Sequence, residues 1–433
     1  MRRYFHRAWR AGALVAAVGL LAACGGGGQS DESGPVTITI QEWSQIPGTP
    51  MEQVIQTFQQ QNPDIRIELA PQIPFGPEYD TRMQTQLGAG TAPTIFRMND
   101  DFLTSFSRQG VLMDLSPYLE GVDTSQYLKP LFDFGRQSDG TYTGFAVGTG
   151  PRVIFYNKTM FEQAGVPLPP STYTDENWKW SDFLAAAEAL TIPGERWGAI
   201  VYTDEGFENT WAMNNGSPDG VFSKDGRRFT LADPVAAQGL QYVVDLTCKE
   251  RVQPPWSELT QDNAAEGLFG QGKVAMLHGA YATNTAIRSL VNGFQYDIAP
   301  VPGNVAHVNE NSLYVYVIPA STPKRQADAA WKFLQYLGSA EAGSVLGQGG
   351  YYVPVNAKGA DAIAPVPGQD PQSMDVLVGS AANGIVPNFP PDNASLAKQL
   401  YRPQLETAYN CDAPVQQVVD GVKDQVEQAL RGS

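Results

Sequence analysis

The chain has 433 residues, of which 29 are basic and 45 are acidic, and its formal net charge at pH 7 is −16. Such an acidic chain has the wrong charge to bind nucleic acid, because phosphates are bound mainly by Lys and Arg. Its length exceeds what one hydrophobic core usually serves, so we expect two lobes.

The first 35 residues have the pattern of an export signal followed by a tether. Residues 1–10 contain four arginines and no acidic residue, and residues 11–23 are apolar but too few to span a membrane as a helix. We therefore expect residues 1–23 to be a signal peptide. Leu21–Cys24 resembles the lipobox of bacterial lipoproteins, in which the cysteine is lipidated; the alternative is an ordinary cleavage site beside a cysteine. Residues 24–35 would then be the lipidated cysteine and a flexible, Gly-rich tether.

Strand and helix patterns alternate from residue 36 onward. Thr49 predicts the N-cap of a helix, with Pro50 at its first position and Glu52 completing a capping box. The order strand, helix, strand predicts a parallel sheet covered on both faces. The predicted elements of this part are a strand over 36–43, a helix over 50–62, a strand over 65–69, a helix over 77–90, a strand over 92–98 and a helix over 102–109.

The alternation continues with different lengths, and the last third of the chain is mostly helical. Short β-branched runs indicate strands, and apolar residues spaced at i, i+3 and i+4 indicate helices. The further predicted strands are 144–148, 152–157, 273–279 and 312–319. The further predicted helices are 160–165, 179–191, 233–250, 282–291, 327–339, 395–409 and 413–430.

Two cysteines, Cys248 and Cys411, lie beyond Cys24. In an exported protein such a pair can be oxidised to a disulfide, and two buried free thiols are the alternative. If they pair, the closed loop is long, and loop entropy predicts a stabilisation of about 4 to 5 kcal/mol.

The sequence offers few groups for catalysis. His278 and His307 are the only histidines after the signal segment, and neither stands in an H-x-x-x-H or H-E-x-x-H pattern, so no His-based zinc site is predicted. Gly267, Gly272 and Lys273 fit the spacing of a phosphate-binding loop, but a helical stretch precedes them and a strand follows, the reverse of that motif. We expect no catalytic residue, no metal and no cofactor. The 45 acidic residues allow a carboxylate pair for glycoside hydrolysis, which keeps a tethered glycosidase as the enzyme alternative.

The segment Val153–Val166, VIFYNKTMFEQAGV, resembles a characteristic segment of the family 1 extracellular solute-binding proteins, the lipid-anchored receptors of bacterial ABC importers for sugars. Phe269–Met276 resembles a second segment of that family. Further similar segments follow the family's order and together cover nearly the whole chain after the tether. They are GAGTAPTIF, GVLMDLSPYL, PVPG, AAWKFLQYLGSAEA and GYYVPVN. The stretch Ser171–Trp180 is longer than the family's usual connection, so the rim of the site is expected to differ.

The resemblance implies an α/β, type II periplasmic-binding fold, with two α/β lobes joined by a hinge and the ligand cleft between them. It implies an N-lobe of residues 36–145 plus 297–337 and a C-lobe of residues 146–296 plus 338–433, with both cysteines of the folded body in one lobe. The implied function is a receptor that captures a carbohydrate by hinge closure and delivers it to the permease subunits of an ABC transporter. The lipid anchor would hold it at the membrane, and we expect a monomer. The same fold carrying a polyamine, a metal or a peptide is the alternative among binding proteins.

Strand ends predict part of the site from physical grounds. In open α/β sheets, ligands bind beyond the carboxyl ends of the strands, and sugars require flat aromatic rings and planar polar groups. Each candidate also has a packing alternative: residues 211–216 fit a helix with a polar C-cap, and residues 309–312 fit a solvated loop. The candidate ligand-binding residues are Trp43, Ser44, Asn99, Asp100, Trp211, Asn214, Asn215, Gly279, Tyr281, Glu310, Asn311, Tyr351 and Arg402.

Overall fold

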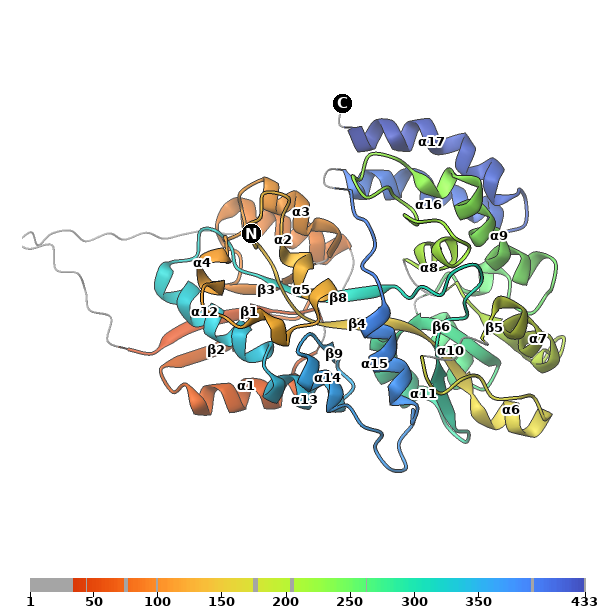
Figure 1. Cartoon of the computed structure of the whole chain (residues 1–433), viewed down its shortest axis with the longest axis horizontal. Helices are drawn as coiled ribbons and strands as arrows, with labels where there is room; N and C mark the ends of the chain where they lie inside the picture. The colour runs from red at the N-terminus through yellow and green to blue at the C-terminus, as the bar shows by residue number, and fades with distance from the viewer. Residues whose placement is uncertain are drawn as a thin grey trace, which may run out of the picture. The chain divides into compact units, whose positions relative to one another are not determined.

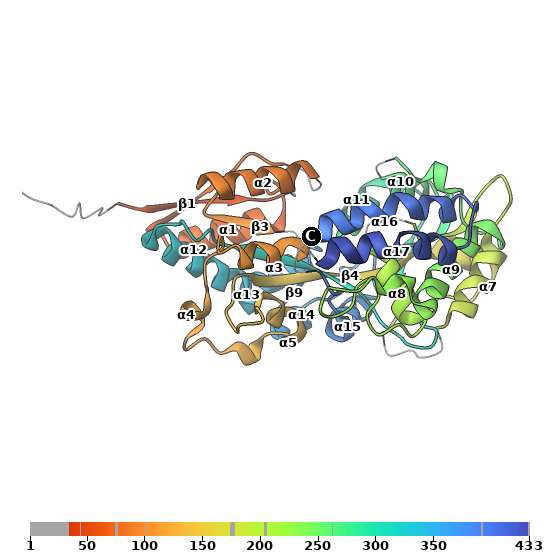
Figure 2. The same cartoon turned by 90° about the horizontal axis from the view of Figure 1, so that it is seen from above.

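A computed structural model provides the structure of the chain (Figures 1 and 2). It describes residues 34–43, 45–73, 77–98, 100–173, 178–202, 206–261, 263–390 and 393–431. The expected signal peptide, Cys24 and most of the tether lie outside the described residues, and so do Ser44 and Asn99. Within the described ranges, no helix is both long enough and apolar enough to cross a membrane. Pro35–Ser433 forms one compact unit, and it contains the whole of the sheet and its helices.

The first part of the sheet is built on parallel strands. β1 (Val36–Gln41) pairs in parallel with β2 (Ile65–Leu69) on one side and with β3 (Ile95–Met98) on the other. β8 (Asn311–Val317) then joins the other edge of β3 in the antiparallel sense. The prediction of a parallel sheet therefore holds for β1 to β3, but the whole sheet is mixed because β8 returns from late in the chain.

β4 (Phe145–Asn157) connects the two parts of the sheet and is buried along its whole length. Its first half pairs antiparallel with β8, and its second half pairs antiparallel with β6 (Val274–Ala280), which continues in parallel to β5 (Trp197–Ile200). β7 (Tyr296–Ala299) and the short β9 (Val353–Pro354) also pair with β4. The described strands form one sheet in the order β2-β1-β3-β8-β4-β6-β5, with β4 and β8 side by side through the middle of the view (Figure 1).

The two strands predicted at 144–148 and 152–157 are in fact one continuous strand, which corrects the sequence-based expectation. Gly148, Gly150 and Pro151 suggested a break, because these residues are poor strand formers. In the structure this stretch keeps its pairing with β8 and accommodates one irregularity between Ala146 and Gly148.

The helices cover both faces of the sheet and supply most of the C-terminal third. α1 (Pro50–Gln61), α2 (Pro77–Ala89), α3 (Asp100–Arg108), α4 (Ser116–Leu119) and α5 (Lys129–Phe132) precede β4. Between β4 and β8 lie α6 (Lys158–Ala164), α7 (Trp180–Leu190), α8 (Phe207–Asn214), α9 (Pro234–Cys248), α10 (Ala264–Gly270) and α11 (Asn284–Leu290). After β8 come α12 (Lys324–Leu337), α13 (Ala340–Gln348), α14 (Ala357–Asp361), α15 (Met374–Asn383), α16 (Ala394–Tyr409) and α17 (Val415–Arg431).

α1 begins at Pro50 after Thr49, as predicted, and buries an apolar stripe against the sheet. The predicted capping box does not form: the Thr49 side chain makes no cap hydrogen bond, and the carboxylate of Glu52 accepts from the backbone N–H of Gly48 at 2.8 Å rather than from that of Thr49. The Thr49 hydroxyl instead donates to the carbonyl of Ile46 at 2.6 Å, which fixes the turn before the helix.

The buried side chains form separate cores in the two parts of the sheet. One core surrounds β1, β3 and β8, and two others lie around β6 and the helices that pack on it. α13 contributes Ala342 and Leu346 to the first core and packs against α1. The lobe boundaries at residues 145, 296 and 337 stay predictions, because no observation on the chain tests where one lobe ends.

A disulfide joins Cys248, at the end of α9, to Cys411, just after α16, with the Cα atoms 5.7 Å apart. The residues are 163 positions apart, so the closed loop is long. We expect the Cys411→Ser variant to lose up to about 4 to 5 kcal/mol of unfolding free energy, since it frees the loop in the unfolded chain. Urea unfolding measures this loss, and a variant lacking both cysteines should not respond to reductant. An unchanged wild-type midpoint after full reduction would contradict the expectation.

His278 lies in β6 with no exposed surface, its ring 5.9 Å from that of Trp211. Burial and the nearby charge of Arg152 lower the pKa of its imidazole well below 6.5. The unfolded chain therefore binds a proton that the folded chain does not, so stability is full above pH 6.5 and falls as the pH drops below it.

From pH 7.5 to 5.0 we expect this single group to remove up to about 2 kcal/mol of unfolding free energy. The variant His278→Leu should lose correspondingly less over the same range, while His307→Gln serves as the matched control. Urea unfolding at the two pH values is the measurement. Equal pH dependence in wild type and His278→Leu would refute the assignment.

Candidate functional site

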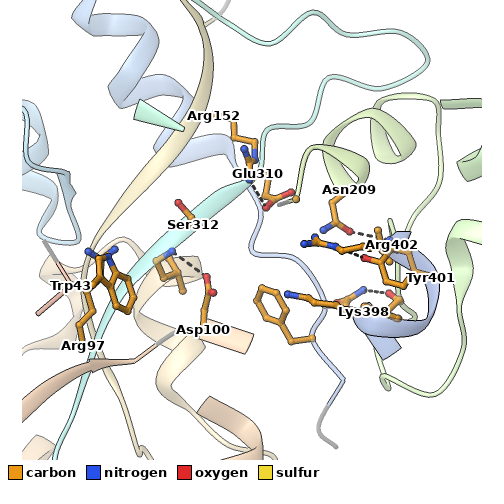
Figure 3. A pocket seen from close by; sticks show the side chains of 16 residues that line it. Trp43, Arg97, Asp100, Arg152, Asn209, Glu310, Ser312, Lys398, Tyr401 and Arg402 are labelled. Atoms are coloured by element: carbon orange, nitrogen blue, oxygen red, sulfur yellow. Dashed lines mark hydrogen bonds and ion pairs between the residues drawn. The ribbon is translucent and has the colours of Figure 1, made fainter. Parts of the chain in front are cut away.

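A pocket of about 240 Å³ lies where the carboxyl ends of β1 and β3 face α16 across β4 and β8 (Figure 3). One wall carries Trp43, Arg97 and Asp100, and Arg152, Glu310 and Ser312 lie at its floor. Asn209, Lys398, Tyr401 and Arg402 lie on the opposite side (Figure 3). Phe222 and Phe389 also line the pocket. Aromatic rings and charged planar groups thus surround one cavity.

Arg97 and Trp43 form the first wall. Arg97 projects from β3, and its guanidinium carbon lies 3.8 Å from the ring centre of Trp43 and 3.5 Å from that of Tyr314. Trp43 also meets Tyr79 edge to face, with 5.2 Å between ring centres. The Tyr79 hydroxyl donates to the carbonyl of Arg97 at 2.6 Å, which holds this part of β3 in place.

A buried carboxylate stands behind this wall. Nη1 of Arg97 lies 3.8 Å from the carboxylate of Glu42, which also accepts a hydrogen bond from the Tyr316 hydroxyl. Burial lowers the pKa of Arg97, but Tyr314 and Glu42 outweigh it and the pKa is raised overall. Arg97 therefore remains charged at any physiological pH.

Arg152 and Glu310 form a buried ion pair at the floor of the pocket. Nη2 of Arg152 lies 3.5 Å from Oε1 of Glu310, and both side chains are almost fully buried. The backbone N–H of Arg152 donates to the carbonyl of Glu310 at 3.1 Å. The segment of Glu310 is also bonded to Ile385. The N–H of Ile385 donates to the carbonyl of Asn309 at 2.8 Å, and the N–H of Asn311 donates to the carbonyl of Ile385 at 2.8 Å. Three chain segments are therefore bound side by side where the pair lies.

The opposite wall is polar and aromatic. Nη2 of Arg402 lies 3.8 Å from the carboxylate of Glu208, and its Nε donates to the Tyr401 hydroxyl at 3.3 Å. Burial raises the pKa of Tyr401 to about 12, so its hydroxyl stays protonated at neutral pH. The amide oxygen of Asn209 accepts from the N–H of Val221 at 2.9 Å, which leaves the amide positioned beside the cavity (Figure 3).

The structure brings four of the predicted residues together at this pocket: Trp43, Asp100, Glu310 and Arg402. Asp100 stands at the start of α3 and accepts from the N–H of Leu313 at 3.3 Å. Trp43 and Asp100 were selected because they follow β1 and β3, and both line this cavity. Their role in ligand binding stays a prediction.

Trp211 and Tyr281 lie elsewhere, which corrects their expected placement. Trp211 has no exposed surface and packs against both Trp180 and Tyr242, at ring-centre distances of 5.3 and 5.4 Å. Tyr281 is 1 % exposed, and its hydroxyl accepts from the amide of Asn284 at 3.2 Å. Both rings are core residues in this structure.

The remaining predicted residues also have structural partners outside the pocket. The amide of Asn214 binds the backbone of Thr210 and Val308, and the amide of Asn311 donates to the carbonyl of Ala381. Asn215 donates to the carbonyl of Val235, Gly279 pairs with Val153 in the sheet, and Tyr351 packs against Tyr314. These residues support the fold, and the described surface of the pocket does not include them.

Several lining residues were not predicted. Arg97 is a charged residue inside the otherwise apolar strand IFRM, and Arg152 lies within the buried strand β4. A charged side chain inside a buried strand is a usable signal, because such a group requires a partner or a ligand. Tyr401 and Lys398 carry no comparable signal, because the face of α16 that meets the pocket is set by tertiary packing.

The pocket can stack against a ligand and form hydrogen bonds to it. No group of three or more His, Cys, Asp or Glu suited to a metal ion occurs among the described residues. Planar charged groups and aromatic rings are the typical lining of sites for polyhydroxylated ligands.

Solved structures with the same fold are proteins that bind solutes for ABC transporters. An ABC substrate-binding protein of Listeria monocytogenes, solved in complex with cycloalternan, has a TM-score of 0.80 at 23 % identity and is covered over 92 % of this chain and 100 % of its own. UgpB from Mycobacterium tuberculosis in complex with glycerophosphocholine has a TM-score of 0.75 at 17 % identity, over 92 % and 99 % of the two chains. The fold is thus the α/β periplasmic-binding fold of the maltose-binding type.

The chain belongs to the bacterial extracellular solute-binding protein family, whose model matches residues 42–344. The erythritol/L-threitol-binding protein of Mycolicibacterium smegmatis is 24 % identical over 391 residues, 79 % of this chain and 78 % of that protein. The chain is therefore an extracytoplasmic solute-binding protein of the ABC-transporter type, and its family consists of binding proteins.

Proposed function

We propose that this protein is the sugar-binding receptor of an ABC importer, which captures a carbohydrate in the pocket and delivers it to the permease subunits. The observation that carries the proposal is the lining of the pocket, where the partly exposed rings of Trp43 and Phe389 lie among planar charged groups. A sugar presents apolar C–H faces to rings and hydroxyls to such groups. The named ligands of two relatives, cycloalternan and erythritol or threitol, are polyhydroxylated compounds, which supports the same class here.

The proposed capture step is closure of two lobes about a hinge. The segments around Arg152, Glu310 and Ile385 are hydrogen-bonded side by side, so a bend there would move the two walls together. The ligand favours closure because it contacts both walls only when they are close.

Thermal unfolding against a panel of mono- and oligosaccharides and polyols tests the proposal, with a polyamine, a divalent metal and a peptide as controls. A ligand at 100 times its dissociation constant should stabilise the protein by about 2.7 kcal/mol. A shift with a sugar or polyol is expected. A shift with a control and with no sugar would transfer the proposal to the same fold carrying another solute.

Membrane attachment through a lipid on Cys24 is part of the proposal, on the basis of the Leu21–Cys24 segment. Cells fed a labelled fatty acid should incorporate label into the wild type, and Cys24→Ser should abolish it. Label that persists in Cys24→Ser would reject this anchor. A monomeric receptor is proposed as well, and light scattering of the purified protein checks it.

A further inference from the structure

Arg97 is a buried cation whose hydrogen-bonding capacity is incompletely used. Its side chain is 7 % exposed, and its contact with Glu42, at 3.8 Å, is longer than a hydrogen bond. Its Nε has no hydrogen-bond partner among the described residues. Glu42 in turn accepts from Tyr316, so its charge is not directed at Arg97 alone. Burying a charge that makes no close hydrogen bond to its partner costs free energy of folding, unless a further group hydrogen-bonds to that charge.

The two aromatic rings determine how a ligand can reach Arg97. Trp43 covers one face of the guanidinium at 3.8 Å, and Tyr314 covers the other at 3.5 Å. The N–H bonds of a guanidinium lie in its plane, so only its edge remains for a ligand in the pocket that Arg97 lines. An approach in this plane, with two oxygens side by side, is the geometry of a carboxylate or a phosphate group.

The charged residues that line the pocket also favour an anionic ligand. Arg97, Arg152, Lys398 and Arg402 line it with the carboxylates of Asp100 and Glu310, while Glu42 and Glu208, the partners of Arg97 and Arg402, are absent from the lining. This excess of cations occurs in a chain that has 29 basic and 45 acidic residues. Cationic groups at the surface of the pocket attract an anionic group of a ligand.

We propose that the ligand is a sugar or polyol bearing an acidic group, a carboxylate or a phosphate, and that Arg97 binds this group edge-on between Trp43 and Tyr314. The inference rests on the proposed function and specifies the ligand class of the same pocket. Hydrogen bonds to a charged group contribute more to binding than hydrogen bonds between neutral groups. The acidic group therefore accounts for a large share of the affinity.

The test is calorimetric titration of the purified protein with matched probes. Glucose, galactose, glycerol and erythritol are each compared with their phosphates, and the two hexoses also with their uronates. We expect the acidic member of at least one set to bind at least about 10-fold more tightly than its neutral partner, as one extra charge-assisted hydrogen bond implies. Phosphate and uronate arms show which acidic group is preferred.

Variants separate the role of Arg97 from general effects. Arg97→Met should abolish the preference for the acidic probe, and Arg97→Lys should retain it only in part, because lysine keeps the charge without the planar edge. Arg66→Met removes an exposed cation of β2 outside the pocket and should leave the preference unchanged. If Arg97→Met fails to fold, the preference for the acidic probe is compared between the wild type and Arg97→Lys. An undiminished preference in Arg97→Lys would contradict the role of Arg97.

The outcomes distinguish this inference from the proposed function. If sugars or polyols bind but no acidic member binds more tightly than its neutral partner, the inference is overturned and the sugar receptor stands. Equal binding of inorganic phosphate and the sugar phosphates would also overturn it, because the polyol would then contribute nothing. Failure of every sugar and polyol, acidic or neutral, to bind would overturn both.

Discussion

Replacing Trp43 with alanine should weaken binding of the cognate sugar by about 30-fold or more, equivalent to about 2 kcal/mol. Trp43 lines the pocket and supplies one of the rings that flank Arg97. The variant loses the stacking surface and also uncovers one face of the guanidinium, so that water competes for it. Calorimetric titration with the sugar identified by thermal unfolding is the measurement.

The matched control is Trp197→Ala. Trp197 is likewise partly buried, but it lies in β5, packs against a hydrophobic core and is absent from the lining of the pocket. It should lower stability without changing the dissociation constant. Equal loss of affinity in both variants would mean that the effect of Trp43 is general destabilisation, and unchanged affinity in Trp43→Ala would remove Trp43 from the site.

Breaking the buried ion pair should have the largest effect on stability. We expect Arg152→Met to lose about 3 to 5 kcal/mol of unfolding free energy, because the carboxylate of Glu310, itself 6 % exposed, loses its cationic partner. The double variant Arg152→Met with Glu310→Gln should recover a large part of that loss, because it also removes the buried negative charge. Urea unfolding of the four proteins completes the double-mutant cycle.

An exposed pair provides the comparison for this cycle. Arg228 and Asp233 form an ion pair at 3.1 Å, with side chains 56 % and 41 % exposed. Arg228→Met should therefore cost no more than about 1 kcal/mol. If Arg152→Met and the double variant prove equally unstable, lost packing rather than an uncompensated charge would explain the loss.

Local patterns predicted most of the individual elements. The alternation in Val36–Gln41 and the Thr49-Pro50 start of α1 each depend on neighbours in sequence, and both were located to within a few residues. The continuity of β4 was missed because it depends on β8, which lies more than 150 residues further along the chain. No local pattern near Gly148 reports that pairing.

The site residues likewise divide into those that local sequence patterns indicate and those that tertiary packing determines. Trp43 and Asp100 were found because strand ends can be read from sequence, and the topology then brings these ends together. Trp211 was misplaced because its surroundings, Trp180 and Tyr242, come from other helices. An aromatic residue in a sequence is equally suited to a core and to a ligand platform, and only tertiary packing decides between them.

The central claim is that this chain binds a sugar and releases it unchanged. The most direct measurement is calorimetric titration of the purified protein with the sugar that stabilises it most, followed by chromatographic analysis of all recovered carbohydrate. The account predicts saturable binding at one site per chain, loss of that binding in Trp43→Ala, and recovery of the sugar intact. No saturable binding of any sugar, or its conversion to a product by the wild type, would contradict the account.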